Sequence, residues 1–156
     1  MTDFSQFTAL QVPADVTATY KFDDLPGAPT ITSSPMTDDN VDYLTERVRE
    51  SVRRSGAEAL PVLADDDEEG RIKRLVDGLL ADEERDRVLL AKCCIRGWTV
   101  TDAKGKQVPV SEPVALAFLK AIPLNEFRGF RNWSQNIANF RARPTITAQQ
   151  GEKLGN

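Results

Sequence analysis

The sequence predicts a mainly α-helical protein with small β elements (α+β), in which helices surround a short hairpin at residues 98–110 and short strands precede the first helix. Apolar residues recur every three or four positions in several long segments, which is typical of amphipathic helices. Alternation of apolar and polar residues over 16–22 indicates a half-buried strand, and a turn ending in Gly105 indicates the hairpin. A chain of 156 residues can form one domain with its own core.

The predicted domain covers residues 16–143 and is mostly helical. Residues 1–15 are expected to be a flexible lead-in, and an acidic linker is expected near residues 57–70. Residues 144–156 contain few apolar side chains and no helical period, so we expect a flexible C-terminal tail.

The first helix is predicted after two N-terminal strands, at residues 16–22 and 30–32. Thr37 or Asp38 can cap this helix, and Gly56 can follow its end. Its apolar residues form one stripe and its charged residues lie mostly elsewhere, so we expect the stripe to pack on a larger body. The stripe consists of Val41, Leu44, Val48 and Val52.

A second helix is predicted from residue 71, beyond the acidic linker. Residues 71–81 carry five apolar side chains at helical spacing, and the helical pattern continues over 82–95. The sequence does not decide whether this helix breaks or only bends near residue 81. Gly97 is expected to end the helix.

The hairpin is predicted to form a corner between helices. Residues 98–101 should form one strand, Gly105 a left-handed turn position, and residues 106–108 the return strand. Ser111 is then placed to cap a helix over 112–121. Trp98 should be inserted where these elements meet.

Large side chains at helix-face spacing define the predicted core. We expect the following residues to lie in it: Trp98, Phe118, Leu119, Phe127 and Phe130. The same C-terminal region mixes aromatic rings with arginines, a combination that can bind a partner. The candidate partner-binding residues are Trp133, Arg128, Arg131, Phe140 and Arg141.

The residue types argue against an enzyme. The chain has no histidine and two adjacent cysteines, Cys93 and Cys94, which on a helix point in different directions. The common catalytic triads, His-containing zinc sites and glycine-rich phosphate loops are therefore absent from the sequence. We expect no catalytic residue, no metal and no cofactor, with the cysteines packed as small apolar residues. No apolar run is long enough to cross a membrane.

Charge is divided unevenly between the two halves of the chain. Residues 1–70 hold fifteen acidic and five basic residues, whereas residues 71–156 hold nine acidic and fifteen basic ones. A nucleic-acid-binding C-terminal half is one interpretation. The basic residues are scattered rather than clustered, which favours complementarity between the halves or with a protein partner.

The order of several motifs resembles the tail assembly chaperones of long-tailed bacteriophages. The resemblance lies in APTITSSPMTDDNVDYLTERV at 28–48, IRGW at 95–98, VTDAKGKQVPVSEPVALAFLKAIP at 100–123 and FRGFRNWSQNIANFR at 127–141. These four segments lie within residues 28–141, a span of about three quarters of the chain.

The resemblance implies a mostly helical, non-enzymatic protein that assists virion assembly. Such chaperones keep the tape measure protein soluble, recruit tail tube protein, act in the host cytoplasm and are absent from the mature virion. The alternatives are a permanent component of the phage tail or neck and, less favoured, a nucleic-acid-binding accessory protein. Whether the chain forms a homo-oligomer stays open.

Overall fold

The computed structural model describes residues 2–57 and 67–141 and has a mainly helical fold with a small sheet, which confirms the predicted class. The three strands are β1 (Ala18–Lys21), β2 (Thr30–Ser33) and β3 (Ile95–Trp98), in the order β1-β2-β3 with antiparallel pairing. The main helices are α2 (Val41–Ala57), α3 (Glu68–Leu89), α4 (Glu112–Ala121) and α5 (Leu124–Ser134). The predicted lead-in contains one short helix, α1 (Ser5–Thr8), and the predicted tail lies beyond the described residues.

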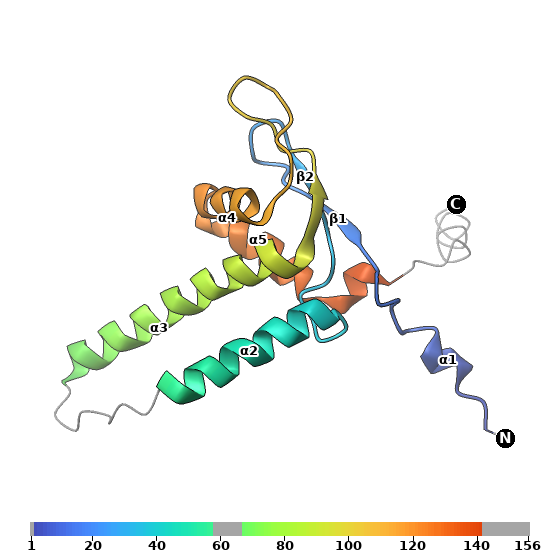
Figure 1. The fold of residues 1–156 in the computed structure, drawn as a ribbon, viewed down its shortest axis with the longest axis horizontal. Coiled ribbons are helices and arrows are strands. Elements are labelled where there is room, and N and C mark those ends of the chain that lie inside the picture. The colour runs from blue at the N-terminus through green and yellow to red at the C-terminus, as the bar shows by residue number, and fades with distance from the viewer. Residues whose placement is uncertain (1, 58–66, 142–156) are drawn as a thin grey trace, which may run out of the picture.

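One face of the sheet packs against α4 and α5. Tyr20 and Phe22 of the first strand region point to this face because strand side chains alternate. The Phe22 ring lies 5.7 Å from that of Phe118 and 5.8 Å from that of Phe130. The core is therefore a junction of the sheet with these two short helices and with residues 89–94 at the end of α3 (Figure 1).

The local capping signals account for two helix starts. The Ser111 hydroxyl accepts a hydrogen bond from the Val114 amide, and α4 has the predicted bounds. Asp67 caps α3 by accepting from the Gly70 amide at 2.7 Å, and two glutamates occupy the first turn, where the helix dipole favours negative charge. Helix α3 begins three residues before the predicted start and runs through residue 81 without a break.

Several predicted boundaries differ from the structure, and α2 runs through Gly56 to Ala57 instead of ending before this glycine. Asn40 rather than Thr37 or Asp38 precedes α2, and its side-chain oxygen accepts from the Tyr43 amide. Gly97 does not end a helix: a π-helical turn, Leu90–Cys94, follows α3, and Gly97 already lies in β3.

The predicted hairpin at 98–110 is a narrow loop with little strand character. Thr101 and Gln107 form an isolated bridge, and Gly105 has a φ of 79°, the left-handed conformation expected of the turn. The strand predicted at residues 98–101 lies earlier in the chain. It is β3, which pairs with β2 from Ile95 onward. Trp98 is 6% exposed, and its indole N–H donates to the Val108 carbonyl at 2.6 Å.

Candidate functional site

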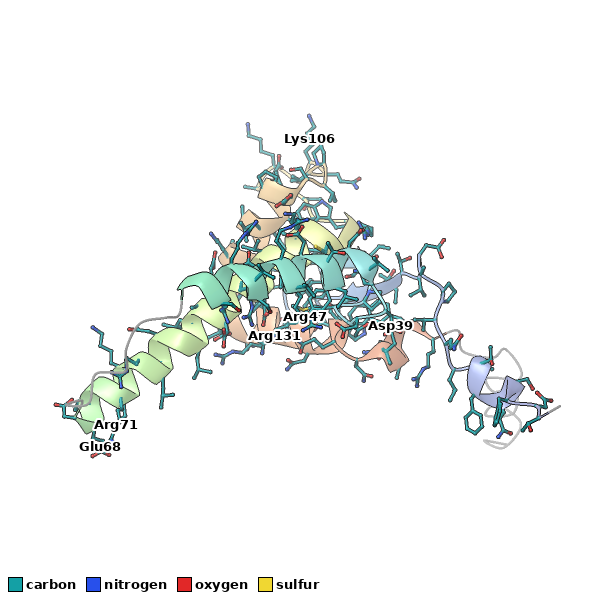
Figure 2. The ribbon with its side chains drawn as sticks, turned by 60° about the horizontal axis from the view of Figure 1, so that its bottom comes forward. Asp39, Arg47, Glu68, Arg71, Lys106 and Arg131 are labelled. Carbon is teal, nitrogen blue, oxygen red and sulfur yellow. The ribbon has the colours of Figure 1, made fainter. Side chains whose placement is uncertain are left out.

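The most unusual feature of the molecule is the apolar surface on α2 and α3. These two helices extend together from the rest of the fold (Figure 1), and the first turns of α3, marked by Glu68 and Arg71, lie far from the core (Figure 2). Eight large apolar side chains on the two helices are exposed, more than on any other pair of described elements. They form two stripes, one on each helix.

The first is the α2 stripe, which consists of Val41, Val48 and Val52. These side chains are 63%, 49% and 67% exposed, so the prediction that this stripe packs on a larger body is wrong. Leu44, the fourth residue of the predicted stripe, is half-buried. The residues that approach α3 and the core lie on another face of α2.

That other face of α2 combines Tyr43, which packs against the core, with charged side chains. Arg54 pairs with Asp82 of α3 at 3.2 Å, and Lys92 pairs with Glu46 at 3.2 Å. The hydrogen bond from Lys92 holds the pKa of the Glu46 carboxyl below its usual range. Helix α2 therefore meets the rest of the chain through Tyr43 and ion-paired side chains, while its three valines are exposed.

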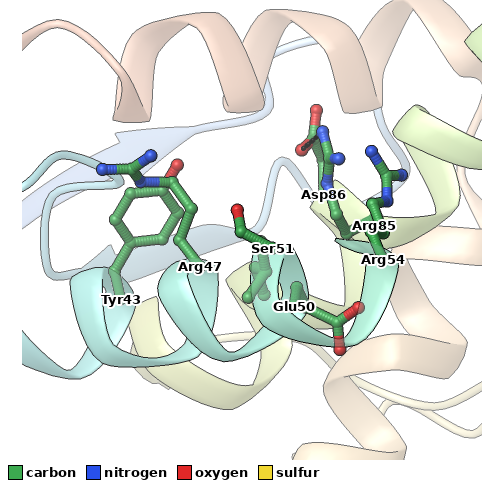
Figure 3. Close-up of a pocket in the computed structure, with 8 residues that line it drawn as sticks. Tyr43, Arg47, Glu50, Ser51, Arg54, Arg85 and Asp86 are labelled. Carbon is green, nitrogen blue, oxygen red and sulfur yellow. Dashed lines mark ion pairs between the residues drawn. The ribbon is translucent and has the colours of Figure 1, made fainter. Parts of the chain in front are cut away.

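A small polar hollow of about 190 Å³ lies between the two helices (Figure 3). Tyr43, Arg47 and Arg54 reach it from α2, and Arg85 and Asp86 reach it from α3. Burial raises the pKa of the Asp86 carboxyl, and the charge of Arg85 opposes this shift. Arg85 and Asp86 pair with each other within α3, whereas the Arg54–Asp82 pair joins α2 to α3 beside this hollow.

The second is the α3 stripe, which lies on the first half of that helix. Every residue from 71 to 81 is exposed. The stripe consists of Ile72, Leu75, Val76, Leu79 and Leu80, at 46%, 70%, 47%, 64% and 56% exposure. Their spacing of three, one, three and one residues puts them on one side of the helix.

The arginines predicted to contact a partner are engaged within the chain. Arg128 forms two hydrogen bonds with Glu83, at 2.9 and 2.8 Å, and these bonds lower the pKa of the Glu83 carboxyl. Arg131 lies 3.8 Å from Glu83 and 3.6 Å from Asp86, and its guanidinium lies 5.6 Å from the centre of the Phe127 ring. Both arginines join α5 to α3.

The other predicted partner-binding residues have different environments. Phe140 is 3% exposed and packs against Trp133, so its ring is not presented to a partner in this conformation. Trp133 is half-buried and also contacts Tyr20. Arg141 is exposed and donates to the carbonyl of Leu10 at 3.1 Å.

The residues predicted to form the core do lie there. Trp98, Leu119, Phe127 and Phe130 are buried, and Phe118 is half-buried against them. Periodicity identified these residues. It also identified the two exposed stripes, but it gave no indication that they would be exposed.

A shallow apolar groove of about 500 Å³ lies beside the core. The turn near Pro26, the start of the long loop at Val100 and the end of α4 at Ile122 line it, with Phe118 at its base. The groove contains no charged side chain, so it can accommodate an apolar side chain of a partner.

The two cysteines are buried and have free thiols. Burial raises the pKa of the Cys93 thiol to about 11 and that of Cys94 further, so neither is a thiolate near neutral pH. The Asn40 amide donates to the carbonyls of Cys93 and Pro35, both at 3.0 Å. The cysteines thus lie in the packed junction between α2 and the π-helical turn.

No group of three or more cysteine or acidic side chains in residues 2–57 and 67–141 is arranged to hold a metal ion. Within the same ranges, no helix combines the length and apolar character needed to cross a bilayer.

Comparison with known proteins finds no match for this chain among protein-family models, curated proteins or solved structures.

Proposed function

We propose that this protein is a tail assembly chaperone of a long-tailed bacteriophage. In this role it binds helical segments of the tape measure protein, keeps them soluble and recruits tail tube subunits to them in the host cytoplasm. The support comes from the ordered motifs in the sequence and from the exposed apolar surface of α2 and α3.

The observation that carries the proposal is the orientation of α2. A helix that exposes valines at 63%, 49% and 67% while its charged face contacts the rest of the chain leaves apolar area in water. Such area is typical of a surface that binds another protein. The spacing of the α2 stripe suits an amphipathic helix of a partner, which would pack its own apolar face on these valines.

The proposal is tested by expressing this chain together with the tape measure protein encoded by the same genome. We expect the soluble fraction of the tape measure protein to rise and the two proteins to copurify. The double variant Val48→Asp/Val52→Asp should lose both effects, because it places two charges on the α2 stripe. A tape measure protein that stays insoluble beside the wild-type chain would refute the proposal.

The matched control is Arg49→Gln/Arg53→Gln. It changes the net charge by the same amount on the same helix, at side chains that pair with Glu46 and Glu50 outside the α2 stripe. We expect this variant to bind like the wild type. Equal loss of binding in the two variants would show that net charge, and not the α2 stripe, controls the interaction.

The alternative of a permanent tail or neck component is tested by mass spectrometry of purified virions. A chaperone that leaves during assembly should be absent or far below the amount of any structural protein. Recovery at a fixed ratio to the tube protein would support the structural alternative.

A further inference from the structure

One flank of the α2 stripe carries charged side chains whose sign changes along the helix. Asp42 lies beside the first valine of the stripe, and Arg49 and Arg53 lie beside the second and the third, about a quarter of a turn round the helix from them. All three side chains are exposed. We name these three residues the α2 rim. Its charge changes from negative to positive over about 10 Å, the rise between positions 42 and 49.

The two arginines present positive charge to a partner although each has an acidic neighbour. Arg49 pairs with Glu46 and Arg53 pairs with Glu50, one turn back along the helix. The arginine side chains are 50% and 63% exposed, whereas the glutamates are 12% and 34% exposed. Lys92 also holds Glu46 from the side of the core. The groups that reach furthest into solvent on this part of the rim are therefore guanidinium groups.

The start of the rim is negative. Asp42 pairs with Arg96 of β3 at 3.3 Å, but its side chain is 71% exposed and that of Arg96 is 42% exposed. Asp39, which lies just before α2, is exposed as well (Figure 2). A partner therefore meets carboxylates at the start of α2 and guanidinium groups along its second half.

The other flank of the stripe is uncharged close to the valines, where Leu44, Ser51 and Ser55 lie. Arg47 lies farther round the helix on that side. Both carboxylate oxygens of Asp38 accept hydrogen bonds from it, at 3.0 and 3.1 Å. The rim is therefore the part of α2 that can distinguish the two directions of a helix packed on the stripe.

Opposite charges on a bound helix would match the rim in a defined order. We call the helical segment of the tape measure protein that packs on the α2 stripe the client helix. Its acidic side chains would lie against Arg49 and Arg53, and its basic side chains against Asp42. The dipole of any helix favours acidic residues in its first turn and basic residues in its last turn. Both conditions are met together only when the client helix runs antiparallel to α2.

We propose that the α2 stripe binds an amphipathic client helix that runs antiparallel to α2, with acidic residues in its N-terminal turns and basic residues in its C-terminal turns. This inference rests on the proposed function and adds the direction and the charge pattern of the partner. The valines supply the apolar area for binding. The rim supplies the direction, because exposed charge pairs contribute more to specificity than to affinity.

The first test uses a synthetic peptide of the same length as α2, with leucines at helical spacing, glutamates in its first turns and lysines in its last turns. One version carries a cysteine at its N-terminal end and another carries it at its C-terminal end. Chains carrying Ser55→Cys, at an exposed position near the end of α2, should form a disulfide with the N-terminal version about fivefold faster at low salt. The natural cysteines are 2% and 0% exposed and should give no background.

The matched variants separate the rim from net charge. Arg49→Gln/Arg53→Gln, added to the Ser55→Cys chain, should still bind the peptide through the α2 stripe but react with its two versions at similar rates. Lys104→Gln/Lys106→Gln removes the same charge from the loop after β3, where Lys106 lies away from α2, and should keep the preference (Figure 2). Equal rates for the two versions with the unmodified rim, or a faster reaction of the C-terminal version, would overturn the proposal.

The second test uses the complex with the tape measure protein itself. A photo-crosslinking residue replaces Ser55 in one chain and Val41 in another, and mass spectrometry identifies the tape measure residues that each captures. Antiparallel packing requires that the residue captured from position 55 precede the residue captured from position 41 in the tape measure sequence. The reverse order would overturn this inference and leave the proposed function standing, whereas failure to form any complex would refute the proposed function.

Discussion

Asn40 shows how one side chain can join distant parts of this fold. It is 4% exposed, and its amide donates to the Pro35 and Cys93 carbonyls while its oxygen accepts from the Tyr43 amide. These bonds tie the start of α2 to the π-helical turn after α3. The sequence favoured Thr37 and Asp38 as caps because both residue types cap helices well, and nothing local distinguishes Asn40 from them.

Trp98→Ala should strongly destabilise the protein. The indole ring packs 5.4 Å from the Phe118 ring, and its N–H donates to the Val108 carbonyl. Removal of a buried aromatic side chain costs about 3–5 kcal/mol, a large share of the stability of a typical domain. Thermal unfolding should show a much lower Tm, and an unchanged melting curve would show that the ring contributes little to the core.

Cys93→Ala/Cys94→Ala should fold and keep the tape measure binding that we propose. Each substitution removes one sulfur atom from a packed site, so we expect a loss of stability on the order of 1–2 kcal/mol. In the wild type, a pKa of about 11 makes Cys93 slow to react with thiol reagents in the folded state at neutral pH. Fast labelling of the folded chain, or loss of client binding by a well-folded double variant, would point to a role in function.

At the scale of elements, the contact between α3 and α5 depends on an ionised carboxylate. Glu83 has a pKa below its ordinary value of 4.5 because Arg128 donates to it. A lowered pKa in the folded state means that this contact stabilises the fold above pH 4.5. The contribution is lost as the pH falls below that value through the lowered pKa.

Glu83→Gln should therefore lower the Tm at neutral pH and have less effect in acid. We expect a decrease of about 2–4 °C at pH 7. The difference in Tm should shrink as the pH falls below 4.5 through the lowered pKa, because the wild-type carboxyl becomes protonated. Melting curves over this pH range test the assignment, and a difference in Tm that does not change with pH would rule out the ion pair as its cause.

At the scale of the whole molecule, the chain exposes two apolar stripes, one on α2 and one on α3. The α2 stripe faces away from α3, and the α3 stripe continues the face that α5 covers.

Deletion of residues 144–156 should leave the Tm nearly unchanged and preserve tape measure binding. This expectation comes from the polar composition of the segment, which lies outside the described residues. In the family that the sequence resembles, many members gain a frameshifted extension near this end that binds tube subunits. A truncated gene unable to make an extension should then fail to support tails in an infection complementation assay, and normal tails would show that no such extension is needed.

The sequence by itself determined the local features of this protein. Ser111 caps α4, Gly105 adopts the left-handed turn and helical periodicity selects Leu119, Phe127 and Phe130 for the core, because each signal depends on neighbours along the chain. The fold class follows from the same signals.

Only the tertiary structure decided which apolar faces the chain covers. The stripe of α2 and the stripe of α3 have the same periodicity as buried helices, since periodicity shows that a face is apolar and not what lies against it. Nothing in the sequence shows that Arg128 and Arg131 have partners within the chain. In the structure they form ion pairs with Glu83 and Asp86, which are more than forty positions away. Pairing and burial depend on which distant segments meet, and that information is not local.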